Sequence, residues 1–160
     1  MLWRRMSLAL ALVAALASPA RAEGGEKPWG VTIWGLSYHT NKSIDYDEGN
    51  WGLGLRYYFN RHVFVEGDAL RNSNRGLVLP ASAGVELGMG TLFGACKVSA
   101  IGALTVAYYQ NPRTESNYVK VGPVPGVSFH CGRIQPNVIA ILSPSSQILA
   151  AIVGSLTIRF

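Results

Sequence analysis

The chain has 160 residues, of which 49% are apolar and only 14% are charged, so it is long enough for one domain behind a leader segment. Its net charge of +5 is a weak hint of nucleic-acid binding, but three of the 14 basic residues, Arg4, Arg5 and Arg21, belong to the N-terminal segment. The rest of the chain has 11 basic against 9 acidic residues and no basic run, which excludes a nucleic-acid partner.

The first 22 residues have the pattern of a secretory signal peptide. Arg4 and Arg5 supply a positive start, residues 7–17 form an apolar run, and Ala20-Arg21-Ala22 places small residues around a cleavage site. That run would rise only about 16 Å as a helix, against a hydrocarbon core of about 30 Å. We therefore expect a cleaved signal peptide over 1–22 and a single domain over 23–160, in which no later apolar run is long enough for a transmembrane helix.

Alternating apolar residues, bounded by turn residues, predict eight strands over 30–38, 51–59, 62–71, 77–89, 95–108, 119–131, 134–142 and 149–160. The second strand is the clearest, because its apolar residues share one face: Trp51, Leu53, Leu55, Tyr57 and Phe59. The last strand alternates in the same way and ends on Phe160, which resembles the C-terminal insertion signal of bacterial outer-membrane proteins. Short connections alternate with mostly longer ones, including 39–50 and 109–118, as in membrane barrels.

The charged residues distinguish a membrane barrel from a soluble one. Seven of them fall within predicted strands on the face opposite the apolar stripe: Arg56, Glu66, Asp68, Glu86, Lys97, Lys120 and Arg159. A soluble barrel needs the reverse, with apolar residues inside. The pattern therefore predicts an all-β, eight-stranded antiparallel barrel in the bacterial outer membrane, inserted by the barrel-assembly machinery and surrounded by phospholipid and lipopolysaccharide. Aromatic residues at the strand ends fit two interfacial belts: Trp51, Tyr108 and Tyr118 outside, and Tyr57, Phe59 and Phe160 in the periplasm.

The two cysteines are expected to face each other. If Tyr108 pairs with Val119 in the fifth hairpin, the same antiparallel register places Cys96 opposite Cys131. Directly opposed Cβ atoms lie about 4.5–5.5 Å apart, so a disulfide needs little adjustment in the oxidising periplasm. The alternative is two free, buried small residues. Neither cysteine has the partners of a catalytic thiol, and His130 alone is too little for a metal site, so we expect no metal or cofactor.

The lumen and the external rim are the places where function is expected. Residues that line the outer half of the lumen can hold an acyl chain or simply fill a narrow barrel: Gly52, Gly54, Leu70, Val78, Ala103, Ala107, Ile139, Ile141 and Val153. At the rim, His39 ends the first strand and Asn72-Ser73 ends the third, with strand axes about 10 Å apart. A His that takes a proton from a Ser hydroxyl is the minimum requirement for acyl transfer. The alternative is that Asn72-Ser73 only forms a turn and that His39 only meets solvent.

Short stretches across most of the domain resemble the lipid A palmitoyltransferase (PagP) family of barrels: Ser37-Tyr38-His39, 45–48, 51–54, 69–73, 80–84, 121–125 and Ser143-Pro144. The resemblance implies transfer of palmitate from phospholipid to lipid A by an external His and an Asp-Ser pair, here matched by His39, Asn72 and Ser73. It also implies a lateral gate at prolines, which cannot donate to the strand ladder: Pro123, Pro125, Pro136 and Pro144.

The chain departs from that family at two points. Asn72 stands where the family has Asp, and only residues 23–29 precede the first strand, so the family's N-terminal amphipathic helix has no counterpart. Asp45, Asp47 and Glu48 can supply another carboxylate, bind a divalent cation between lipopolysaccharide phosphates, or form a solvated acidic loop. Two hypotheses remain: a lipid A acyltransferase, or a non-enzymatic structural, adhesive or lipid-binding barrel. A pore is disfavoured because side chains fill eight-stranded barrels, and a lipid A deacylase because no His-Ser pair lies within one strand.

Overall fold

The computed structural model describes residues 27–41, 46–92, 94–112, 114–142 and 149–160. The predicted signal peptide, Asp45 and Pro144 lie outside these ranges. The described residues form β1 (Trp29–His39), β2 (Gly49–Tyr58), β3 (Val63–Arg71), β4 (Leu77–Leu92), β5 (Cys96–Asn111), β6 (Ser116–His130), β7 (Ile134–Leu142) and β8 (Leu149–Arg159). Within them, no helix has the length and apolar character needed to cross a membrane.

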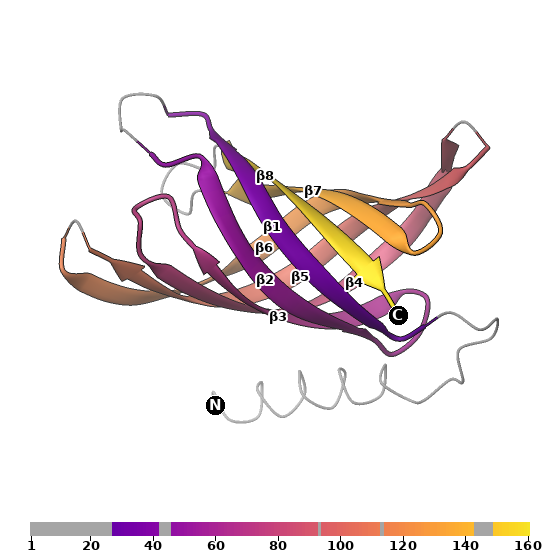
Figure 1. The fold of residues 1–160 in the computed structure, drawn as a ribbon, viewed down its shortest axis with the longest axis horizontal. Helices are drawn as coiled ribbons and strands as arrows, with labels where there is room; N and C mark the ends of the chain where they lie inside the picture. Colours follow the sequence, from indigo (N-terminus) through magenta and orange to yellow (C-terminus); the bar gives the residue numbers. More distant parts are fainter. Residues whose placement is uncertain (1–26, 42–45, 93, 113, 143–148) are drawn as a thin grey trace, which may run out of the picture.

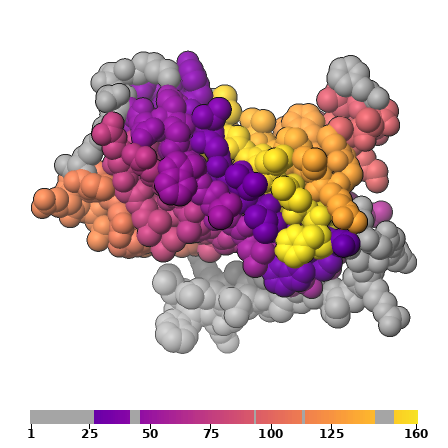
Figure 2. Space-filling model, in the orientation of Figure 1, coloured from indigo at the N-terminus to yellow at the C-terminus, as the bar shows by residue number. Residues whose placement is uncertain are grey.

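The eight strands close into an antiparallel barrel. Each strand pairs with its neighbour in chain order, and β8 pairs back with β1 (Figure 1). The first and last strands, indigo and yellow, lie side by side on the outer surface (Figure 2). The predicted eight-stranded antiparallel barrel is therefore confirmed, with strand boundaries shifted by a few residues at most.

The two ends of the barrel differ. We call the end with the connections after β1, β3, β5 and β7 the loop end, and the opposite end the turn end. The predicted loop over 109–118 is wrong, because β5 and β6 stay paired as far as Asn111 and Ser116. Tyr109 and Tyr118 stack across this hairpin with ring centroids 5.3 Å apart, a cross-strand contact that stabilises the extension.

The two faces of the wall carry opposite kinds of side chain. Large exposed apolar residues lie on every strand except β3, for example Leu53 on β2 and Leu104 on β5. The lumen holds the buried polar residues Thr32, Arg56, Glu66, Asp68, Glu86, Gln135, Asn137 and Thr157. The barrel is thus apolar outside, and its lumen holds charged and polar side chains beside buried apolar ones such as Phe64 and Val78, which differs from the apolar interior and polar exterior of a soluble barrel.

Three basic residues that were predicted to face the lumen do not belong to the buried polar residues of the preceding paragraph. Lys97 is exposed at the turn end, where β4 continues to Leu92 after its last pair with β3 at Val85, so the β4–β5 hairpin projects beyond the wall. Arg159 lies over the Tyr58 ring, 4.3 Å from its centroid. Lys120 lines the inside of the barrel near the loop end.

A network of charged and polar groups fills the lumen near the turn end. Arg56 donates to Glu66 at 2.7 Å and to Glu86 at 3.2 Å. Tyr58 donates to Glu86 at 3.0 Å, and His130 Nε2 lies 2.9 Å from the second oxygen of Glu86. These groups pair with one another in a narrow space and form a polar floor across the barrel.

The β5–β6 hairpin has the register from which the Cys96–Cys131 disulfide was predicted. Tyr108 pairs with Val119, and the ladder continues to Lys97 and His130. The next two residues, Cys96 and Cys131, form a disulfide with Cα atoms 4.5 Å apart. This bond joins the start of β5 to the turn that leads into β7.

Candidate functional site

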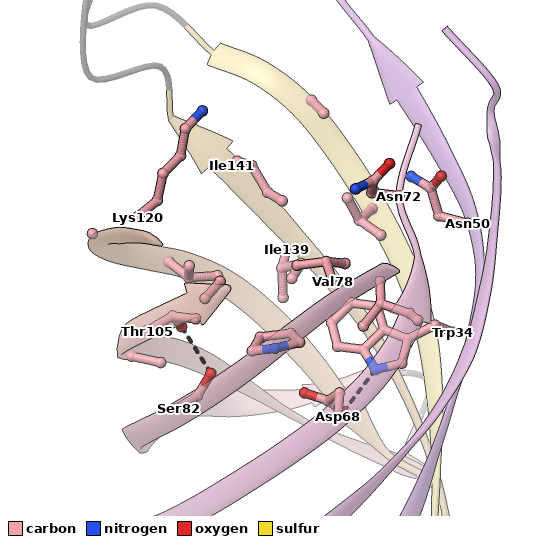
Figure 3. Close-up of a pocket in the computed structure, with 18 of the residues that line it drawn as sticks. Trp34, Asn50, Asp68, Asn72, Val78, Ser82, Thr105, Lys120, Ile139 and Ile141 are labelled. Atoms are coloured by element: carbon pink, nitrogen blue, oxygen red, sulfur yellow. Dashed lines mark hydrogen bonds between the residues drawn. The ribbon is translucent and has the colours of Figure 1, made fainter. Parts of the chain in front are cut away.

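A cavity occupies the lumen between the polar floor and the loop end. Its volume is about 320 Å³, and its walls are mostly apolar: Trp34, Leu70, Val78, Ile101, Ala103, Ala107, Ile139, Ile141, Ala151 and Val153. Two pairs of polar groups on the walls bond to each other: Trp34 Nε1 donates to Asp68 at 2.8 Å, and the Ser82 and Thr105 hydroxyls lie 2.8 Å apart (Figure 3). The cavity is therefore suited to a hydrocarbon chain that enters from the loop end.

Two residues that were predicted to line this cavity do not reach it. Gly52 and Gly54 stand behind Leu70 and Asp68, whose side chains cross directly over them. A Cβ at position 54 would lie 1.7 Å from Asp68 Oδ1. Glycine at this position therefore allows the Asp68 carboxyl to reach Trp34.

His39 and Ser73 meet at the mouth of the cavity. Ser73 Oγ lies 3.0 Å from His39 Nε2, which is hydrogen-bond distance. The intervening strand closes the gap between them, because the Asn50 side-chain amide donates to Ser37 Oγ at 2.8 Å and to Ser73 Oγ at 3.0 Å. Both His39 and Ser73 are largely buried, so the pair is shielded from bulk water.

The second ring nitrogen of His39 faces a carboxylate. His39 Nδ1 lies 3.5 Å from Glu48 Oε2, and Glu48 Oε1 accepts the main-chain N–H of His39 at 3.3 Å. Tyr46 stacks on the other side of the imidazole, with ring centroids 4.4 Å apart. Nδ1 and Oε2 are close but form no hydrogen bond. When Nδ1 carries the proton, the Nε2 lone pair is directed at Ser73. The order Ser73, His39, Glu48 is that of a nucleophile, a general base and an orienting acid.

Asn72 organises the turn that carries Ser73. Its Oδ1 accepts the main-chain N–H groups of Asn74 at 2.9 Å and of Gly76 at 3.0 Å. Its Nδ2 donates to the carbonyl oxygen of Gln110 at 2.7 Å, which fixes the turn to the end of β5. A carboxylate cannot make that donation, so the presence of Asn rather than Asp has a physical reason. The structure thus brings His39 and Ser73 together and assigns the Asn72 side chain to the turn.

Sequence reasoning did not single out Glu48 as the partner of His39, and it missed Asn50 and Tyr46. Asn50 could have been found from the sequence, because it lies on β2, between the strands of His39 and Ser73, and alternation places its side chain on the same inward face as Gly52. The position of Glu48 depends on the path of the β1–β2 connection, where Ser37 N–H donates to the Glu48 carbonyl oxygen at 2.8 Å. No local pattern specifies such a path.

The wall is incomplete between β6 and β7. The two strands pair only at Gly126–Ile139, Val127–Val138 and Ser128–Asn137, and Pro123 and Pro125 lie on the unpaired side toward the loop end. A second cavity of about 350 Å³ opens there and shares four lining residues with the lumen cavity: Ala103, Pro123, Val124 and Leu142. Pro136 lies outside this gap, where it pairs with Leu156 of β8.

Comparison with known protein families and with curated proteins finds no match for this chain. Across the described residues, no three side chains of His, Cys, Asp or Glu are grouped so that they could hold a metal ion.

Proposed function

We propose that this protein is an outer-membrane acyltransferase of the lipid A palmitoyltransferase type, which moves an acyl chain from a glycerophospholipid to lipid A. One observation carries the proposal: Ser73 Oγ lies 3.0 Å from His39 Nε2, the Glu48 carboxylate lies on the side of the other ring nitrogen, and His39 and Ser73 both line a mostly apolar cavity. A nucleophile and a base at the mouth of a mostly apolar cavity suit ester chemistry on a lipid.

The exterior supports a location in a membrane. Trp51 is 66% exposed and Leu53 61% exposed, and comparable apolar side chains surround the wall. At the turn end, Tyr57 contacts both Trp29 and Phe59, with ring centroids 4.7 and 5.1 Å away. An apolar band with aromatic residues near its edge suits a lipid environment. The signal-peptide pattern over 1–22 supports export, and the outer membrane accommodates closed barrels.

The chemistry follows from the three residues in order. His39 Nε2 takes the proton of the Ser73 hydroxyl while Oγ attacks the ester carbonyl of the donor. The tetrahedral intermediate expels the lysophospholipid oxygen, which receives the proton from His39, and the acyl group remains on Ser73. His39 then deprotonates a hydroxyl of lipid A, which attacks the acyl carbonyl and releases Ser73 with its proton. Glu48 stabilises the imidazolium that forms in each step.

The cavity and the gap give the acyl chain a place and a route. The chain of the donor would occupy the apolar cavity, with its ester at the mouth beside Ser73. The unpaired region of β6 and β7 at Pro123 and Pro125 would admit a lipid sideways from the bilayer. A membrane-embedded enzyme needs such an entrance, because its substrate does not pass through water.

The direct test uses the purified, folded barrel in detergent micelles with phospholipid and lipid A. We expect lipid A that is heavier by one acyl group, together with an equal amount of lysophospholipid, and neither product with Ser73→Ala. Free fatty acid without acylated lipid A would indicate a hydrolase. Absence of all products from a folded barrel would favour a non-enzymatic lipid-binding role, for which the same cavity would suffice.

A further inference from the structure

Lys120 is a cation at the cavity mouth, and none of the described carboxylates forms an ion pair with it. It lies on β6, and its Nζ is 5.6 Å from the centroid of the Tyr109 ring and 5.3 Å from that of Tyr118. These two rings stack on each other and also line the cavity. Their faces attract the ammonium group and hold it at the mouth.

Other basic groups near the lumen have ion-pair partners, whereas Lys120 has none within the described part of the chain. Arg56 has two glutamate partners, and Arg71 lies 3.2 Å from Asp47. Among the residues that the structure describes, no carboxylate forms an ion pair with Lys120. Its three N–H donors are therefore available to an anion that enters the mouth.

If Pro123 in the gap lies at the outer edge of the hydrocarbon core, Lys120 lies at the depth of the phospholipid headgroups. It stands three residues nearer the loop end than Pro123, a rise of about 10 Å along the strand. A strand tilt of about 40° makes this about 8 Å along the membrane normal. The headgroup layer extends roughly 5–7 Å beyond the hydrocarbon core. A phospholipid that enters at the gap would thus place its phosphate near Lys120.

Lys120 also lies across the mouth from the nucleophile. Figure 3 shows Lys120 on the opposite side of the cavity from Asn50 and Asn72, the residues that hold Ser73 and its turn. A donor whose phosphate contacts Lys120 and whose chain enters the cavity would direct its ester toward Ser73. We infer that Lys120, supported by Tyr109 and Tyr118, is the phosphate-recognition site for the glycerophospholipid donor, an inference that rests on the proposed acyl transfer.

The test compares two donors that differ only in the phosphate: phosphatidylglycerol, and diacylglycerol with the same acyl chains. The ratio of kcat/KM for the two donors should fall about tenfold in Lys120→Ala, as expected for one lost charge-assisted contact. It should be largely retained in Lys120→Arg. Lys97→Ala is the matched control, since it removes the same charge from the neighbouring strand at the far end of the barrel. Heat-modifiable migration verifies that each variant is folded.

Three results would overturn the inference, each in a recognisable way. An unchanged donor ratio in Lys120→Ala, with transfer intact, would remove Lys120 from donor recognition and leave the proposed function standing. A higher KM for lipid A with an unchanged donor ratio would assign the phosphate to the acceptor. No transfer by the wild-type barrel with either donor would refute the proposed function and with it the donor role.

A binding measurement on the Ser73→Ala barrel keeps the site testable apart from turnover. Fluorescent phosphatidylglycerol should bind about tenfold more weakly when Lys120 is also replaced by Ala, while fluorescent diacylglycerol should bind equally well to both. Equal loss for both lipids would show that Lys120 shapes the mouth and does not recognise phosphate.

Discussion

Replacing Glu48 by Gln removes the charge that faces His39 and leaves the size of the side chain unchanged. In the acylation step His39 becomes an imidazolium, and the carboxylate 3.5 Å from Nδ1 stabilises it. Two unit charges at that distance attract by about 4.7 kcal/mol at an effective dielectric of about 20, and by about 1.2 kcal/mol at about 80. The Glu48 side chain is 37% exposed, so the lower part of this range applies.

We therefore expect Glu48→Gln to lower kcat for acyl transfer by roughly 10–100-fold, at 1.4 kcal/mol per tenfold, with little change in KM. Initial rates with phospholipid and lipid A in mixed micelles measure this. Asp47→Asn is the control, because it neutralises the neighbouring carboxylate, which pairs with Arg71 instead. Full activity in Glu48→Gln, or an equal loss in Asp47→Asn, would refute the assignment of Glu48 as the orienting acid.

Three further predictions concern the turn, the floor and the disulfide. Asn72→Asp should lower the free energy of unfolding by about 1–3 kcal/mol and also lower activity, because the buried hydrogen bond from the side-chain amide to the Gln110 carbonyl oxygen is lost. Higher activity would mean that residue 72 belongs to the catalytic set. Arg56→Gln should destabilise the barrel by about 3–5 kcal/mol, because two buried glutamates lose their partner. Urea unfolding in detergent measures this, and an unchanged unfolding midpoint would contradict the network. Cys96→Ser should lower the free energy of unfolding by about 4 kcal/mol, because the disulfide with Cys131 closes a loop of 35 residues. It should leave kcat unchanged, because this bond lies at the turn end, far from the candidate site. A large fall in kcat of the folded variant would contradict this separation.

The strands and the inside of the barrel were accessible from the sequence for a simple physical reason. Side chains alternate across a strand, so the apolar stripe of Leu53 and Leu55 also fixes Arg56 as an inward residue. The β5–β6 register followed from the same rule once one pair was assumed, and it placed Cys96 opposite Cys131. The extension of this hairpin to Asn111 was not predicted, because it depends on tyrosine stacking across strands rather than on alternation.

The candidate site was only half accessible from the sequence. Its His and Ser could be proposed from the rim positions of His39 and Ser73, but their contact depends on an inward turn held by Asn72 and on the bridging amide of Asn50. Glu48 reaches His39 through the path of a connection between strands. Connections follow hydrogen bonds between residues distant in the chain, which no periodic pattern records.

The central claim is that Ser73 transfers an acyl chain to lipid A, and the most direct measurement is the mass spectrum of lipid A from outer-membrane-competent cells that express the protein. We predict a gain of one fatty-acyl mass with the wild-type chain and none with Ser73→Ala, both barrels being folded in the membrane. A loss of one acyl chain would show the opposite chemistry. An unchanged spectrum with the folded wild-type barrel would contradict the claim.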